Sequence, residues 1–93
     1  MGRAELKVPG GKLLRVSTTV REGRIQDIKI TGDFFLHPED SIDDLESRLQ
    51  GIRAEEDEVS STVKRFFDSH QITVLGATPK DFAAVVLKSF SSA

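Results

Sequence analysis

Polar and apolar residues alternate along the first third of this chain of 93 residues. The clearest segment places Leu14, Val16, Thr18 and Val20 on one face and polar or charged residues on most of the other. A period of two is typical of a strand with one buried face. We therefore predict strands over about residues 4–8, 12–21 and 24–35, joined by turns into an antiparallel meander.

The third of these strands contains an irregularity near its start. Ile28, Ile30, Gly32 and Phe34 share one face, but Ile25 is out of phase with them. A β-bulge inserts one residue and restores the phase of the residues before it. We predict a bulge near residues 26–27, which returns Ile25 to the core; without a bulge, Ile25 is a residue of the core rim.

Two adjacent phenylalanines close the same strand. Successive side chains of a strand point to opposite faces, so Phe35 points away from the core if Phe34 fills it. One interpretation ends the strand by Asp33 and folds Phe35 under the first helix as a hydrophobic staple. The other makes Phe35 an exposed anchor for another protein, since aromatic residues often dominate binding energy. The sequence leaves both open.

The remainder of the chain shows helical spacing of its apolar residues. We predict helices over about residues 42–50, 55–69 and 79–91, with a short extended segment in QITVLG at residues 71–76. Three strands followed by three helices indicate an α+β fold in one domain, residues 1–93. The expected architecture is a three-stranded antiparallel meander with three helices packed on one face.

Local signals support these helix boundaries. Ser41 is a candidate N-cap with Asp44 at the reciprocal position, and Gly51 is placed to end the first helix in the left-handed conformation. Thr78 is a candidate N-cap of the third helix, with Asp81 three residues later. These residues indicate where each helix starts and stops.

Charge is unevenly distributed, although the net charge is only −2. Residues 1–36 carry seven Lys or Arg and four Asp or Glu, whereas residues 37–60 carry two and nine. Such polarity suits docking to a partner. Cysteine is absent, and we find neither a signal peptide nor an apolar membrane span, so we expect a cytoplasmic protein.

The sequence offers little catalytic chemistry. His37 and His70 have no ligand-like spacing to other donors, and the acidic residues 55–58 are consecutive, so they do not converge on one ion. The serines have no nucleophile motif around them. We predict no catalytic residue and no metal site in this chain.

Basic residues gather on the outward face of the predicted sheet. A nucleic-acid surface is one reading, and a face for an acidic protein partner is another. No aromatic residue interleaves with these cations, and acidic residues share the face, which disfavours nucleic acid. The basic residues concerned are Lys7, Lys12, Arg15, Arg21, Arg24 and Lys29.

Three segments together resemble the small accessory domain of lipoate–protein ligases, and in particular its stand-alone form in two-piece archaeal ligases. They are the turn KVPGGK at residues 7–12, the strand end GDFF at residues 32–35, and the helix IDDLESRLQG that closes on Gly51. The likeness continues through GATPKDFAAVVL at residues 76–87. Each motif alone is weak, whereas their order and spacing are fairly specific.

The resemblance implies a non-catalytic subunit that a large catalytic subunit requires to convert lipoate into lipoyl-adenylate. ATP, Mg and lipoate belong to the assembled ligase, and this chain alone binds no cofactor. The lipoyl group then passes to a lysine of a carrier, such as the lipoyl domains of 2-oxoacid dehydrogenases or the glycine-cleavage H protein. The resemblance also suggests where the large subunit docks, at the sheet edge and its basic rim. The candidate interface residues are Lys7, Gly11, Lys12, Arg15, Asp33 and Phe35. The alternative function is a small protein- or nucleic-acid-binding module.

Overall fold

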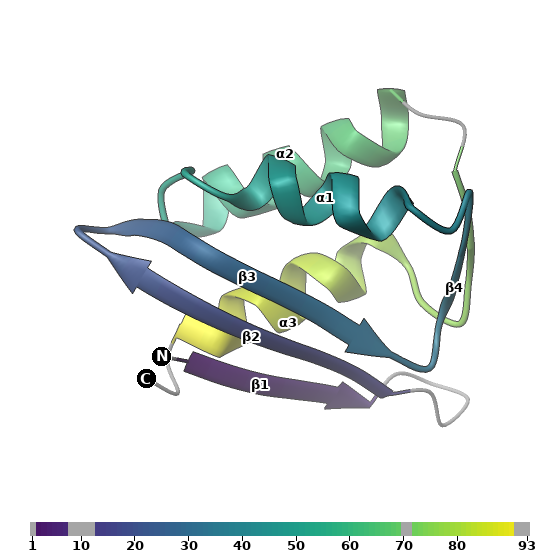
Figure 1. The fold of residues 1–93 in the computed structure, drawn as a ribbon, viewed down its shortest axis with the longest axis horizontal. Coiled ribbons are helices and arrows are strands. Elements are labelled where there is room, and N and C mark those ends of the chain that lie inside the picture. Colours follow the sequence, from purple (N-terminus) through teal and green to yellow (C-terminus); the bar gives the residue numbers. More distant parts are fainter. Residues whose placement is uncertain (1, 8–12, 70–71, 91–93) are drawn as a thin grey trace.

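A computed structural model describes residues 2–7, 13–69 and 72–90. Figure 1 shows a sheet with the helices gathered on one of its sides, the α+β architecture that the sequence predicts. The elements follow one another as β1 (Gly2–Lys7), β2 (Leu13–Arg21), β3 (Arg24–Gly32), β4 (Phe35–His37), α1 (Ser41–Leu49), α2 (Glu56–Ser69), β5 (Thr73–Leu75) and α3 (Pro79–Phe90).

The main sheet is an antiparallel meander in the order β1-β2-β3. Its register shifts between Thr19 and Val20, whose partners are Asp27 and Ile25, so Gln26 is the extra residue of a bulge. Ile25 is only 1% exposed. The predicted bulge is confirmed, and it returns Ile25 to the core because one inserted residue restores the phase.

The hydrophobic core lies between this sheet and the helices. Helix α3 contacts β1 and β2, α1 contacts β3, and α2 packs on α1 and α3. A buried hydroxyl pair links β2 to α3, since Thr18 Oγ1 and Ser89 Oγ lie 2.9 Å apart. The fully buried side chains include Leu14, Ile25, Leu45, Leu49, Val59, Val63, Phe66, Phe82, Val85 and Val86.

The third strand is shorter than predicted. It ends at Gly32, and residues 35–37 form the separate strand β4, which pairs with β5 in a second, two-stranded sheet. Gly32 has φ of 150°, and a side chain there would meet the backbone of Leu13 and Leu14. Alternation continues through this break in the sequence, so a period of two alone did not reveal it.

The helix boundaries are close to those predicted, but the N-cap of α1 differs from the predicted one. Asp40 is the N-cap of α1 and makes no side-chain cap hydrogen bond, while Ser41 lies inside the first turn and is buried. At α3, the Thr78 N–H donates to Asp81 Oδ2 at 2.9 Å, and the Asp81 N–H donates to Thr78 Oγ1 at 3.3 Å. This reciprocal pair is the predicted capping box. Gly51, with φ of 90°, follows α1 as expected.

Candidate functional site

The β4–β5 ribbon exposes two large apolar side chains at one end of the molecule. Phe35 is 71% exposed and Leu75 is 61% exposed. The two residues are register partners across the antiparallel pair, so their side chains lie on the same face of the ribbon. The next partners, Leu36 and Val74, point the other way, and both pack with the core. We call Phe35 and Leu75 the apolar pair.

Aromatic packing holds the chain just before this ribbon. The ring of Phe34 meets that of Phe82 edge-on, with centroids 5.1 Å apart and planes at 86°. Phe82 also stacks on Phe67 at 5.7 Å. Phe34 is therefore anchored on α3 although it lies outside any strand, and the next residue, Phe35, faces solvent. Of the two readings left open by the sequence, exposure of Phe35 is the correct one.

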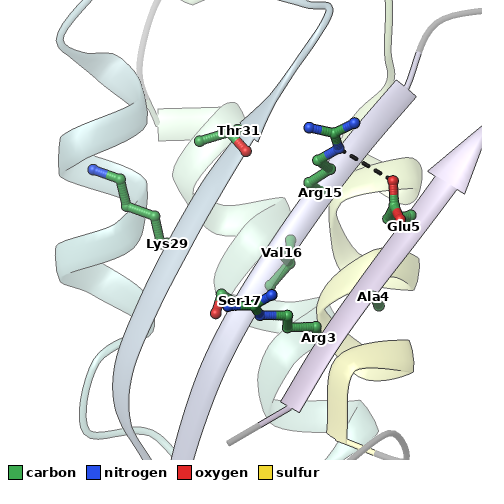
Figure 2. Close-up of a pocket in the computed structure, with 8 residues that line it drawn as sticks. All are labelled: Arg3, Ala4, Glu5, Arg15, Val16, Ser17, Lys29 and Thr31. Carbon is green, nitrogen blue, oxygen red and sulfur yellow. Dashed lines mark hydrogen bonds and ion pairs between the residues drawn. The ribbon is translucent and has the colours of Figure 1, made fainter.

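The outward face of the main sheet carries a shallow basic concavity of about 350 Å³. Figure 2 shows Arg3, Arg15 and Lys29 reaching it from β1, β2 and β3. The small hydroxyl side chains of Ser17 and Thr31 also line it. The helices cover the opposite face of the sheet (Figure 1), so this basic concavity opens to solvent.

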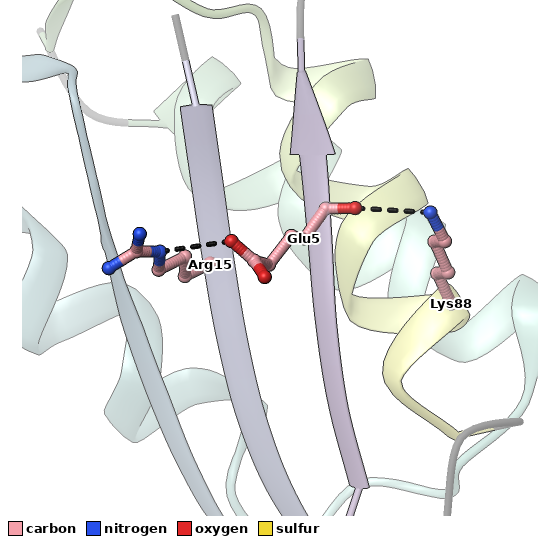
Figure 3. A network of polar contacts seen from close by, with 3 residues as sticks. All are labelled: Glu5, Arg15 and Lys88. Carbon is pink, nitrogen blue, oxygen red and sulfur yellow. Dashed lines mark hydrogen bonds and ion pairs between the residues drawn. The ribbon is translucent and has the colours of Figure 1, made fainter.

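Glu5 is the one carboxylate among the residues that line the basic concavity. Its Oε2 lies 3.1 Å from Arg15 Nε, in an ion pair whose side chains are each 62% exposed. Lys88 Nζ, on α3, donates to the Glu5 backbone carbonyl at 3.1 Å (Figure 3). Such exposed pairs contribute little to stability. The ion pair offsets part of the charge of Arg15, and Lys88 places a further cation beside the edge of β1.

Of the residues that the sequence grouped as interface candidates, the structure brings Arg15 and Asp33 together in one small hollow and places Phe35 on the separate β4–β5 ribbon. Arg15 is in the basic concavity, and Phe35 is in the apolar pair. Lys7 ends β1 and is exposed, while the exposed Asp33 donates its N–H to the carbonyl of Leu13 at 2.8 Å. Gly11 and Lys12 lie outside the described residues.

Two further residues change the sequence-based picture of the surface. Arg24 was expected on the free basic face, but its Nη1 donates to the Gly51 carbonyl at 2.9 Å, so it supports the end of α1. Leu75 was not predicted as an interface residue. The alternation in residues 72–75 indicated this position, because Ile72 and Val74, which are partly buried against the core, place Leu75 on the other face.

Within the described residues, no group of three or more His, Asp or Glu side chains gathers where it could hold a metal ion. Of the described helices, none combines the length and apolar character needed to cross a membrane. The arrangement instead offers two surfaces, one apolar and one basic, on different parts of the fold.

Comparisons with known proteins by sequence and by structure agree with each other. Residues 3–86 match the family model described as bacterial lipoate protein ligase C-terminus. A relative named lipoate-protein ligase A subunit 2, from Thermoplasma acidophilum, is 41% identical over 70 residues, which cover 75% of this chain and 71% of the relative.

A solved structure from the same archaeon has the same fold. It belongs to a study of a bi-partite lipoate protein ligase and its E2 lipoyl domain. The match has a TM-score of 0.81 and 32% sequence identity, and it covers 90% of this chain and 91% of the other.

Proposed function

This chain belongs to the family of lipoate–protein ligase C-terminal domains, and from that premise we propose that it is the small, non-catalytic subunit of a two-chain ligase. In this proposal the chain binds a large catalytic subunit, and the assembled pair activates lipoate with ATP and transfers the lipoyl group to a carrier lysine. The name of the relative as a second subunit and the bi-partite character of the matched ligase support this assignment.

The apolar pair is the single observation that best supports association with a partner. Phe35 and Leu75 together present two large exposed side chains on a ribbon of only two short strands. Leu36 and Val74 hold the ribbon to the core, and the adjacent apolar groups exposed on its other face are typical of an interaction site. Covering this pair with the large subunit removes apolar surface from water.

ATP, Mg and lipoate are assigned to the assembled ligase in this proposal. The contribution of the small subunit is positional: its docking orders segments of the large subunit around the nucleotide and limits access of water. The interface must be extensive, because two separate chains lose translational and rotational freedom when they associate. We expect the assembly to act in the cytoplasm.

The activation step provides the test. Lipoate-dependent exchange of pyrophosphate into ATP is measured for the large subunit alone, for this chain alone, and for the two mixed. We expect exchange only from the mixture, rising with the concentration of the small subunit until it saturates. Full exchange by the large subunit alone, or adenylation of lipoate by this chain alone, contradicts the proposed function.

Substitution of the apolar pair locates the contact. Phe35→Ala and Leu75→Ala should each weaken association by about 1–3 kcal/mol, which is the range for an anchor residue, and so raise the concentration needed for half-maximal exchange. Val20→Ala is the matched control, because Val20 is 40% exposed and lies on β2 near the β2–β3 turn, at the far end of the sheet. An equal loss in the control places the interface elsewhere.

A further inference from the structure

The basic concavity has an ordered arrangement that follows from the register of the sheet. Ser17 on β2 pairs with Arg3 on one side and Lys29 on the other. One step along the strands, Arg15 pairs with Glu5 and with Thr31. Ser17 therefore lies among three cations from three strands, while Thr31 lies at the edge of the group, beside Arg15 and Lys29 (Figure 2).

The remaining apolar residues of this site lie beneath the surface. Ala4 and Val16 line the concavity but are 7% and 2% exposed. A ligand here meets guanidinium, ammonium and hydroxyl groups. Among the described residues that line the concavity, Glu5 is the carboxylate that opposes them, and Asp33 lines an adjoining hollow with Arg15 and Thr31. The chemistry that complements this surface is a cluster of carboxylates.

The two surfaces differ in the kind of interface they suit. Permanent interfaces between subunits are more apolar than transient ones. Charged surfaces mainly raise the association rate and select the partner, and they contribute less to lasting affinity. The apolar pair therefore suits a subunit that stays bound, whereas the basic concavity suits a partner that arrives and leaves in every catalytic cycle.

We propose that the basic concavity docks an acidic surface of the carrier domain that receives the lipoyl group, so that this subunit helps to select the protein substrate. The inference rests on the proposed function, in which the carrier is the partner that must dissociate after each transfer. It assigns the small subunit a role in the second half-reaction, which is separate from its role in activation.

A nucleic-acid ligand fits the same residues less well. Among the described residues that line the concavity, none has an aromatic ring on which a base could stack. Glu5 and Asp27 also place negative charge on this face, where a phosphate backbone would have to lie. Carboxylates on a folded domain can be spaced to avoid these two residues, whereas a continuous phosphate backbone cannot.

The test uses the assembled two-chain ligase and the unmodified E2 lipoyl domain of the same organism. A triple variant replaces the cations of the concavity by glutamine: Arg3→Gln, Arg15→Gln and Lys29→Gln. Each exposed charge pair is weak, so together we expect about a tenfold rise in KM for the lipoyl domain. Pyrophosphate exchange and kcat for transfer should not change.

A control variant removes the same number of cations from the helical side of the molecule. Arg48, Lys64 and Lys80 are exposed on α1, α2 and α3, and their replacement by glutamine should leave KM unchanged. Circular dichroism checks that both variants are folded. For the wild-type ligase, KM should rise between 50 and about 300 mM salt, because screening weakens contacts between exposed charges.

The outcomes separate this inference from the proposed function. If the large subunit activates and transfers lipoate fully without this chain, the proposed function fails. If the small subunit is required but the triple variant has the wild-type KM, only the carrier-docking surface is wrong. Loss of pyrophosphate exchange in the triple variant makes the concavity part of the permanent interface. Salt-sensitive binding of an oligonucleotide that the triple variant loses, with KM unchanged, makes the concavity a nucleic-acid surface instead.

Discussion

Truncation to alanine should lower the stability of the fold at Phe34 and leave it nearly unchanged at the adjacent residue, Phe35. Phe34 is half-buried and meets Phe82 edge-on, whereas Phe35 is 71% exposed. Complete removal of a buried Phe side chain costs about 3–5 kcal/mol. Because Phe34 is only partly buried, we take about half of this cost; adding about 0.5–1.5 kcal/mol for the lost aromatic pair gives about 2–4 kcal/mol for Phe34→Ala.

Thermal unfolding measures this difference directly. In a domain of this size 1 kcal/mol corresponds to about 4–8 °C in Tm, so Phe34→Ala should lower Tm by about 8–30 °C. Phe35→Ala should change stability by no more than about 0.5 kcal/mol, as for most surface substitutions. The chain has no Trp or Tyr, so circular dichroism of the helices is a better probe than intrinsic fluorescence.

The contrast also connects stability with function. Phe35→Ala should weaken association with the large subunit while the isolated chain keeps its Tm. Phe34→Leu is a useful intermediate, because it keeps apolar volume and loses only the edge-to-face contact. A fall in Tm for Phe35→Ala as large as that for Phe34→Ala would refute the assignment of the two rings to opposite sides.

Two further predictions concern the contacts that hold the fold. Thr78→Ala removes the hydroxyl that accepts from the Asp81 N–H, and it should cost about 1 kcal/mol in urea unfolding, as for other N-cap losses. Thr18→Val keeps the shape and removes one hydrogen bond to Ser89, while the Ser89 hydroxyl still donates to the Val86 carbonyl at 2.6 Å, so the substitution should cost about 0.5–1.5 kcal/mol. No measurable change for Thr18→Val would mean that this hydroxyl pair does not hold α3 against the sheet.

Local signals in the sequence were sufficient for much of the fold. The period of two identified the three long strands, and the phase error at Ile25 located the bulge at Gln26. The capping box at Thr78 was also readable, because its two partners are only three residues apart. These features depend on neighbours in the chain, so the chain itself records them.

The misassigned parts depend on contacts between distant residues. The spacing of Ser41 and Asp44 fits a capping box, but Asp40 is the N-cap and Ser41 is buried within the first turn. The strand through Phe35 looked continuous, yet β4 leaves the main sheet to pair with β5. Pairing between segments almost forty residues apart leaves no local periodicity to read.

The same division applies to the candidate surfaces. Alternation assigned strand cations such as Arg15 and Lys29 to the outer face, but it left two positions open for Phe35. Only the tertiary structure decided that Leu75 lies beside Phe35 and that Arg3, Arg15 and Lys29 surround one concavity. The physical reason is that strand alternation determines which way a side chain points, whereas the register between strands and the reversals of the chain determine which side chains become its neighbours.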